Sequence, residues 1–285
     1  MSRSISYGGR VVTRRSLLVA AGAAVVGAAP LAGPAAAALP ELDMEALIRA
    51  AQIDPRRADT ALTEGAKESV LLVERALQAR GLLSSSYVDG HFGTSTIAAY
   101  AAYQRSLGYT GLDATGLPGP SSLRSLGEGR YTVVKAISPG SVVTLRGAQV
   151  NTRTRSMLFE AERLLGRQLG ITQGSYSSGV GASAGTHDGG GALDLSVSNL
   201  SSAVRTDILR RLRTVGFAAW LRTPEQGDWG YHIHAIALSD TDQSTGAQNQ
   251  AGDYYLGRNG LANRGADDGP AVSPKRTWEE YQRTL

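Results

Sequence analysis

Hydrophobic residues recur at helical spacing in two separate regions of the chain. Residues 64–127 carry an apolar stripe that ends at Gly81 and a second stripe that ends at Gly108, followed by a third short helical pattern. Residues 153–169 and 201–215 repeat the helical pattern, with charged side chains on the opposite face. These patterns predict a small three-helix region, followed by a region that contains two amphipathic helices.

Other segments have the patterns of strands. Residues 192–197 and 231–238 alternate between apolar and polar positions, and residues 216–221 are continuously apolar. Shorter strand-like pieces occupy residues 131–137 and 141–145. The chain is therefore predicted to be α+β, with a small three-helix N-terminal domain followed by a domain with a mainly antiparallel sheet flanked by helices.

The first 38 residues have the order of an export signal: arginines, then an apolar run, then small residues up to Ala38. Residues 13–18 resemble a twin-arginine motif, which predicts export by the Tat pathway, cleavage near Ala38 and a secreted or cell-wall location. The alternative is an uncleaved membrane anchor. Because the run is short and broken by Pro30 and Pro34, we expect no stable membrane insertion after cleavage of the signal.

The charge of the chain is concentrated in this first segment. The whole chain has 29 basic and 25 acidic side chains, but four of the arginines precede residue 38, so the remainder is balanced. A balanced chain without a basic stripe offers no general attraction for nucleic acid, and we expect no nucleic-acid partner. The chain has no Cys, which excludes disulfides and thiolate metal sites and leaves His and carboxylate side chains as metal ligands.

Three of the four histidines lie in two short segments. His187 precedes three consecutive glycines and Asp194, and His232 and His234 follow later in the chain. Zinc accepts imidazole nitrogen and carboxylate oxygen, and a catalytic zinc site keeps one position open for water. Alternation in residues 192–197 directs Asp194 away from the apolar side, while the glycines permit a tight turn that returns His187 over the start of the strand. We therefore expect His187 and Asp194 to converge.

His232 and His234 lie on the same face of their predicted strand, roughly 7 Å apart. One of them can hold a metal ion while its neighbour reaches the substrate. The alternative is that all these residues are ordinary polar groups on a half-buried sheet. The clustering of three histidines with a suitably spaced Asp favours a metal site.

The same residues resemble the zinc D-Ala-D-Ala carboxypeptidase family, peptidase family M15, in the pattern of His187, Gly190, Ala192, Asp194, Trp229, His232 and His234. The resemblance covers about residues 130–262 and implies a fold shared with lysostaphin-type and hedgehog-type domains. It also implies that His187, Asp194 and His234 bind zinc and that His232 is the catalytic histidine.

Two positions differ from the family pattern. Gly185 stands where the family usually has Ser, and residues 171–178 contain no Arg, although the family usually carries one on this strand to steady the substrate carbonyl or carboxylate. Loss of such a donor typically lowers the rate on the order of a hundred- to a thousandfold. Gln173, Tyr176 and a distant Arg are candidates to replace it.

The loop before His232 supplies further candidates. Trp229 is expected to wall the cleft and contact the substrate. A carboxylate near zinc can accept a proton from bound water, so Asp228 or Glu225 is a secondary candidate for the general base. His232 is the first choice, because the strand pattern places it beside His234.

Residues 65–127 resemble the three-helix peptidoglycan-binding domain, through Leu77, Gln78, Gly81, Asp89, Gly90, Phe92, Gly93, Thr96, Tyr103, Gln104, Gly116, Gly119, Leu123 and Leu126. The resemblance implies peptidoglycan as the partner. Most of these positions are expected to shape a turn or fill the core rather than contact the ligand, and His91 is expected to be an exposed loop residue. Residues 39–64 are either a linker or a packed extension, and residues 263–285 are a C-terminal tail.

The leading hypothesis is an exported, monomeric zinc peptidase that acts on peptidoglycan peptides, as a D-Ala-D-Ala carboxypeptidase or an endopeptidase. The alternative is a non-catalytic peptidoglycan-binding protein whose metal site is structural or recognises a peptide, and the missing Arg motivates it. A glycan-cleaving hydrolase needs two carboxylates facing each other across a cleft, and the sequence offers no convincing pair.

Overall fold

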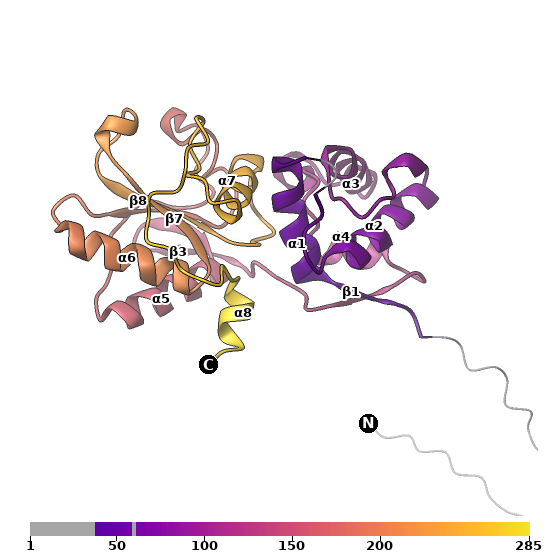
Figure 1. Cartoon of the computed structure of the whole chain (residues 1–285), viewed down its shortest axis with the longest axis horizontal. Coiled ribbons are helices and arrows are strands. Elements are labelled where there is room, and N and C mark those ends of the chain that lie inside the picture. The colour runs from indigo at the N-terminus through magenta and orange to yellow at the C-terminus, as the bar shows by residue number, and fades with distance from the viewer. Residues whose placement is uncertain (1–37, 59–60) are drawn as a thin grey trace, which may run out of the picture. The chain divides into compact units, whose positions relative to one another are not determined.

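Helices dominate the first half of the described chain, and a sheet organises the second (Figure 1). The computed structural model describes residues 38–58 and 61–285, so the predicted export signal lies outside the described residues except for Ala38. Leu39–Leu285 form one unit that contains separate hydrophobic clusters. Within the described residues, no helix combines the length and the apolar character needed to cross a bilayer.

The first cluster is built by four helices, whose bounds are α1 Met44–Ile53, α2 Lys67–Ala79, α3 Thr94–Ser106 and α4 Pro120–Leu126. Strand β1 (Glu41–Asp43) pairs in parallel with β2 (Thr132–Val134) beside them. The helical spacing of the apolar residues in α2 buries Val70, Val73 and Leu77. The three predicted helices are α2, α3 and α4.

Residues 39–58, the first part of the segment predicted as a linker or a packed extension, form a packed extension. Leu42, Met44, Leu47 and Ile48 are fully buried in the first cluster. Asp43 caps α1 by accepting a hydrogen bond from the backbone N–H of Ala46 at 3.1 Å. The helical core therefore extends beyond the boundary predicted at residue 65.

His91 is buried, with 5% of its surface exposed, so its prediction as an exposed loop residue was wrong. Its backbone N–H donates to Asp89 Oδ1 at 2.8 Å, which folds the turn back on itself. The ring packs so closely against Gly93 that a Cβ there would lie 2.8 Å from Nδ1. His91 thus fills the inside of the turn.

The second half begins with an antiparallel hairpin of β3 (Val142–Leu145) and β4 (Ala148–Asn151). A four-stranded antiparallel sheet follows in the order β5-β6-β8-β7, with bounds Ile171–Gln173, Ala192–Ser196, His232–Ala237 and Phe217–Arg222. The helices are α5 Thr152–Leu165, α6 Ser202–Thr214, α7 Thr245–Tyr255 and α8 Trp278–Gln282. Short 3-10 turns occupy Asp54–Arg56, Ser85–Tyr87, Gly111–Ala114, Gly181–Ser183 and Pro224–Gln226. The predicted α+β class is confirmed.

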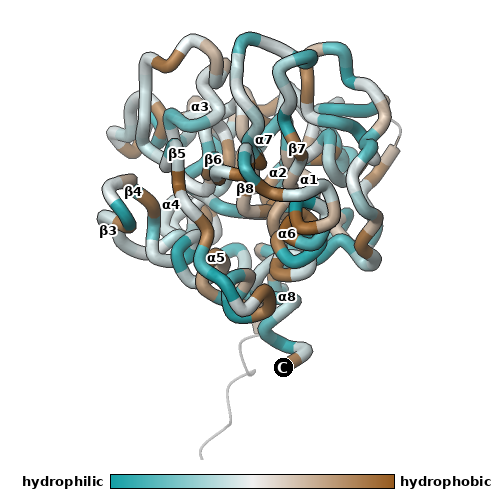
Figure 2. Tube along the Cα trace, turned by 90° about the vertical axis from the view of Figure 1, so that its left-hand side faces the viewer, coloured by the Kyte–Doolittle hydropathy of each residue, from teal (hydrophilic) through white to brown (hydrophobic). Residues whose placement is uncertain are grey.

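The two faces of the sheet have different partners. One face packs against α5 and α6, in a hydrophobic cluster that includes Leu193, Phe217 and Ile233. Both helices carry hydrophilic as well as hydrophobic residues along their length (Figure 2). Ala218 and Ile236 project to the opposite face, where they pack with α7. Because side chains alternate along a strand, the polar residues of β6 and β8 emerge on the α7 face. This face carries the candidate site.

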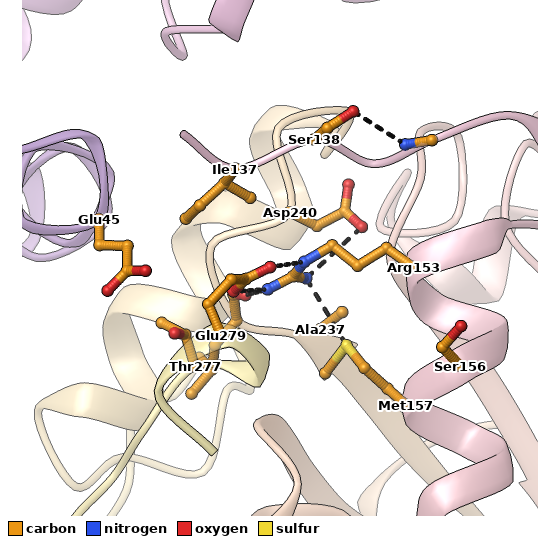
Figure 3. Close-up of polar contacts among 12 residues, drawn as sticks. Glu45, Ile137, Ser138, Arg153, Ser156, Met157, Ala237, Asp240, Thr277 and Glu279 are labelled. Atoms are coloured by element: carbon orange, nitrogen blue, oxygen red, sulfur yellow. Dashed lines mark hydrogen bonds and ion pairs between the residues drawn. The ribbon is translucent and has the colours of Figure 1, made fainter. Parts of the chain in front are cut away.

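The C-terminal segment packs into the second half through a buried arginine (Figure 3). Arg153 of α5 donates from Nε and Nη2 to the two carboxylate oxygens of Glu279 at 2.7 and 2.8 Å. Its Nη2 also donates to the carbonyl oxygen of Leu238 at 2.9 Å, and Asp240 lies 3.8 Å from Nη1. Tyr281 is buried in the same hydrophobic cluster as α5 and α6, so residues 263–285 are part of the folded unit.

Candidate metal centre

Two rows of side chains cross the α7 face of the sheet. In the first row Asp194 of β6 lies opposite Gln173 of β5 on one side and His234 of β8 on the other. Directly opposite residues of antiparallel strands share a face of the sheet. In the second row His232 lies opposite Ser196 and Arg222. The strand register therefore places Asp194, His234 and His232 together before any loop contributes.

The glycine-rich turn supplies His187. A Cβ at Gly189 would lie 2.3 Å from the carbonyl oxygen of Asp242, and one at Gly190 would lie 2.7 Å from the Asp242 side chain. Gly191 adopts φ +83°, a conformation that side chains disfavour. The glycines are therefore needed both for the predicted turn and for close contact with the segment that follows β8.

Three potential ligand atoms converge beside the sheet. Nε2 of His187 lies 3.3 Å from Oδ1 of Asp194 and 3.3 Å from Nδ1 of His234. Nδ1 of His234 lies 2.8 Å from Oδ1 of Asp194. Both histidines are buried, and the side chain of Asp194 is 14% exposed. The three side chains predicted as metal ligands are thus brought together, and the group could hold a metal ion.

The outer nitrogens of both rings are occupied by hydrogen bonds. Nδ1 of His187 lies 2.8 Å from the carbonyl oxygen of Gly174, so it must donate. Nε2 of His234 lies 2.7 Å from Oε1 of Gln250, whose amide nitrogen donates to the carbonyl oxygen of Gly260. In the neutral rings the lone pairs are then on the nitrogens that face Asp194. Such outer hydrogen bonds are typical of histidines that bind metals.

The local electrostatics also favour a cation between these groups. Burial opposes charge on Asp194, but its contacts with His187 and His234 hold the pKa of this carboxyl well below its usual range. Burial lowers the pKa of His234, although Asp194 opposes the shift. The carboxylate of Asp194 and one lone pair from each imidazole would present three electron-pair donors to one point, which a divalent cation can satisfy.

His232 is placed beside this group. Its Nδ1 lies 2.9 Å from the carbonyl oxygen of Gly230 and must donate to it, so Nε2 of the neutral ring carries the lone pair. Nε2 lies 3.8 Å from Oδ1 of Asp194. Trp229 packs edge-on against the His232 ring, with the ring centroids 6.2 Å apart. The ring is held in a fixed orientation next to the potential metal ligands.

A cavity of about 690 Å³ opens over these side chains. It is lined by His187, Asp194, His232 and His234, and by two of the predicted substrate-binding residues, Gln173 and Trp229. Arg222, Gln226, Gln250 and residues 260–263 complete much of the remaining lining. The cavity is large enough for a short peptide segment.

Two predicted site residues do not line the cavity. Tyr176 adopts φ +56°, and its hydroxyl donates to Oδ2 of Asp242 at 2.8 Å. Asp228 is exposed in the loop that follows the 3-10 turn Pro224–Gln226, and it is not among the residues that line the cavity. Tyr176 therefore supports the turn around Gly190. Asp228, predicted as a secondary candidate for the general base, lies outside the cavity that contains the potential metal ligands.

Sequence reasoning missed Arg222 and Gln250. The signal for Arg222 was present, since extending the predicted strand 216–221 by one residue puts Arg222 on the same face as Trp220. No local pattern marks Gln250, because its contact with His234 depends on the way that α7 packs over the sheet.

Comparison with protein-family models, with curated proteins and with solved structures gave no match for this chain.

Proposed function

We propose that this chain is an exported zinc-dependent peptidase that acts on peptidoglycan peptides. The observation that carries the proposal is the convergence of His187, Asp194 and His234 at the edge of a cavity that also contains His232. The sequence resemblance to the zinc D-Ala-D-Ala carboxypeptidases assigns the same three residues as ligands and the same histidine as catalytic.

Zinc fits the donor set. Two imidazole nitrogens and one carboxylate oxygen are ligands that zinc prefers, and three protein ligands leave a position free for water or substrate. Zinc bound there would polarise a scissile carbonyl and lower the pKa of a water molecule. The ligand rings are kept in place by Gly174 and Gln250, which accept hydrogen bonds from their outer nitrogens.

His232 is the proposed proton carrier. Its donor nitrogen is committed to Gly230, so the lone pair of Nε2 is available to accept a proton from water and later to deliver it to the leaving amine. Because the ring also packs against Trp229, it needs no reorientation before the proton moves. Residues 65–127 would hold the protein on the cell wall, as their resemblance to peptidoglycan-binding domains implies.

The test combines metal analysis with digestion of purified peptidoglycan. The exported protein is expected to contain about one zinc per chain and to release peptide products that mass spectrometry can identify. His187→Ala should lose both the metal and the products, whereas His232→Gln should keep the metal and lose the products. Absence of bound metal at this site would refute the proposal.

The same experiment distinguishes the non-catalytic alternative. A wild-type protein that binds zinc and sacculi but leaves the peptide composition unchanged after long incubation would be a wall-binding protein with a structural or peptide-recognition metal. The presence of Arg222 in the cavity weakens the argument for that alternative, because an arginine is available after all, on β7 instead of β5.

A further inference from the structure

One wall of the cavity is formed by a loop that follows α7. Residues 260–263 line the cavity, and a β-bridge between Arg258 and Ala266 closes the base of the loop. Arg264 adopts φ +49°, a conformation that side chains disfavour, so contacts outside the loop must stabilise its shape. Residues 259–263 are called the wall segment below.

The sheet and α7 hold the wall segment from the side of the metal centre. Nη1 of Arg222 donates to the carbonyl oxygen of Asn259 at 2.9 Å. The amide nitrogen of Gln250 donates to the carbonyl oxygen of Gly260 at 3.0 Å, while its oxygen accepts from His234. A single side chain therefore connects the wall segment to a potential metal ligand.

Both ends of the wall segment are fastened to Arg56, which lies in the 3-10 turn after α1 in the helical half. Arg258 and Arg264 flank the segment and donate to the carbonyl oxygen of Arg56 at 3.3 and 2.9 Å. Asp253 of α7 accepts hydrogen bonds from Nε and Nη2 of Arg56 at 3.2 and 2.8 Å, and from Arg258 at 3.1 Å. These four residues are called the clasp.

Asp253 is the buried centre of the clasp. Only 2% of its surface is exposed, and guanidinium nitrogens of Arg56, Arg258 and Arg264 all lie within 3.7 Å of its carboxylate. A buried carboxylate needs charged or hydrogen-bonding partners, and hydrogen bonds between charged groups are stronger than those between neutral groups. Because one carboxylate holds all three arginines, the orientation of Arg56 affects both ends of the wall segment.

Arg56 has a defined position because α1 is packed tightly on α7. A Cβ at Gly252 would lie 2.0 Å from the carbonyl oxygen of Gln52, so the backbones of the two helices touch. Nε2 of Gln52 also donates to Oε1 of Gln243 at 2.7 Å, and both side chains are buried. The clasp therefore links a fixed part of the helical half to the wall of the cavity.

We propose that Arg56 is a positioning residue for the cavity, which fixes both ends of the wall segment through Asp253 and thereby sets the surface that meets the substrate. The helical half is then part of the framework of the binding site, in addition to any attachment to the cell wall. The effect on substrate affinity rests on the proposed function, whereas the order of the wall segment does not.

The test is Arg56→Gln, which removes the guanidinium and leaves the backbone carbonyl in place. Asp253 keeps its hydrogen bond from Arg258, so the variant is expected to fold. Hydrogen–deuterium exchange on the zinc-loaded protein should be roughly tenfold faster in the wall segment and unchanged in α1 and β8. With soluble peptidoglycan fragments, KM should rise roughly tenfold and kcat should change less than about twofold, because the wall segment binds substrate and transition state alike.

Arg49→Gln is the matched control. Its side chain is 27% exposed, against 21% for Arg56, and it also joins the helical half to the second half, through Glu280. It should alter neither the exchange of the wall segment nor KM. Arg56→Lys keeps the charge and should restore part of both effects. If thermal unfolding shows that Arg56→Gln is not folded, Arg264→Gln removes a more exposed arm of the clasp and should give a smaller change in the same direction.

The outcomes separate the inference from the proposed function. Unchanged exchange of the wall segment in a folded Arg56→Gln, equally faster exchange throughout the chain, or a faster-exchanging wall segment with an unchanged KM overturns the inference and keeps the peptidase. Faster exchange confined to the wall segment, in a protein whose wild type hydrolyses no peptide, keeps the positioning of the wall and refutes the peptidase.

Discussion

Two buried arginines on either side of the same sheet have opposite surroundings. Arg153 lies in a closed network in which Glu279, Leu238 and Asp240 complete its contacts. Arg222 lies at the cavity with a single carbonyl acceptor. The first arginine joins α5 to the C-terminal helix, so its partners are all within the protein. Within the described residues, Arg222 has one hydrogen-bond acceptor, the carbonyl oxygen of Asn259, and its Nη2 has none, so the two arginines differ in how completely the protein itself satisfies them.

The largest expected effect is at the centre of the cavity. Asp194→Asn replaces the charged ligand by a neutral amide and should abolish stoichiometric zinc binding and, with it, all peptide release. Metal content after dialysis and digestion of peptidoglycan measure the two effects. Glu279→Gln, in the closed network, should leave the metal content unchanged. If Asp194→Asn retains zinc with wild-type affinity, the proposed ligand set is wrong.

Stability should separate the two arginines directly. Arg153→Met leaves Glu279 and Asp240 buried without their counter-ion and should lower the free energy of unfolding by about 3 kcal/mol. Arg222→Met removes a buried charge that has no carboxylate partner and should change the free energy of unfolding by less than about 1 kcal/mol. Urea denaturation of both variants tests the contrast. Similar losses in both would mean that Arg222 is as structural as Arg153.

Gln250 tests the hydrogen bonds behind the ligands. Gln250→Ala removes the acceptor for Nε2 of His234 and should weaken zinc binding roughly ten- to a hundredfold, because the ring loses its fixed orientation. Competition with a chelator of known affinity measures the change. Asn249→Ala, one residue away on the same helix, is the control and should bind zinc as the wild type does. Equal affinities for the two variants would contradict the assigned role.

The last prediction concerns Glu74 in the helical core, away from the metal centre. Its carboxylate accepts hydrogen bonds from the N–H groups of Asp89 and Gly90 and from Thr96. Burial raises the pKa of Glu74 to about 7, although the hydrogen bond from Gly90 opposes the shift. A carboxyl whose pKa is raised on folding takes up a proton, so its contribution to stability is present below its ordinary value of 4.5 and is lost as the pH rises through about 7.

This contribution can be isolated by replacing Glu74 with Gln, which does not titrate. The wild type should lose stability relative to Glu74→Gln between pH 5 and pH 8, when both are unfolded with urea. An unchanged difference between the two proteins over this range would show that Glu74 has an ordinary pKa in the folded state.

The sequence predicted the elements whose apolar residues are periodic. The alternation in β6 and β8 correctly indicated that Asp194, His232 and His234 share one face, because this depends only on the two-residue period of a strand. Helix α7 was not predicted. It is rich in Gln, Asn and Gly, and only Ala247, Ala251 and Tyr254 pack against the sheet, so it lacks a strong hydrophobic stripe.

The parts of the site that could not be predicted depend on packing between distant segments. The contact of Gln250 with His234 exists because α7 lies over the sheet, and residues 260–263 reach the cavity only after that helix ends. Tyr176 was predicted near the substrate, but a left-handed backbone and its bond to Asp242 direct its hydroxyl into the neighbouring turn. Proximity in sequence to His187 gave no information on that direction.

Helix α1, near the start of the folded unit, is bound to the last residues of the chain. Glu45 accepts two hydrogen bonds from Arg283 at 2.6 and 2.7 Å, and Arg49 pairs with Glu280. During synthesis α1 leaves the ribosome long before residues 280–283 are made. Glu45 and Arg49 therefore form these ion pairs only after that segment has been translated. A substitution that removes Glu280 or Arg283 would therefore weaken the attachment of helix α1 as well as that of helix α8.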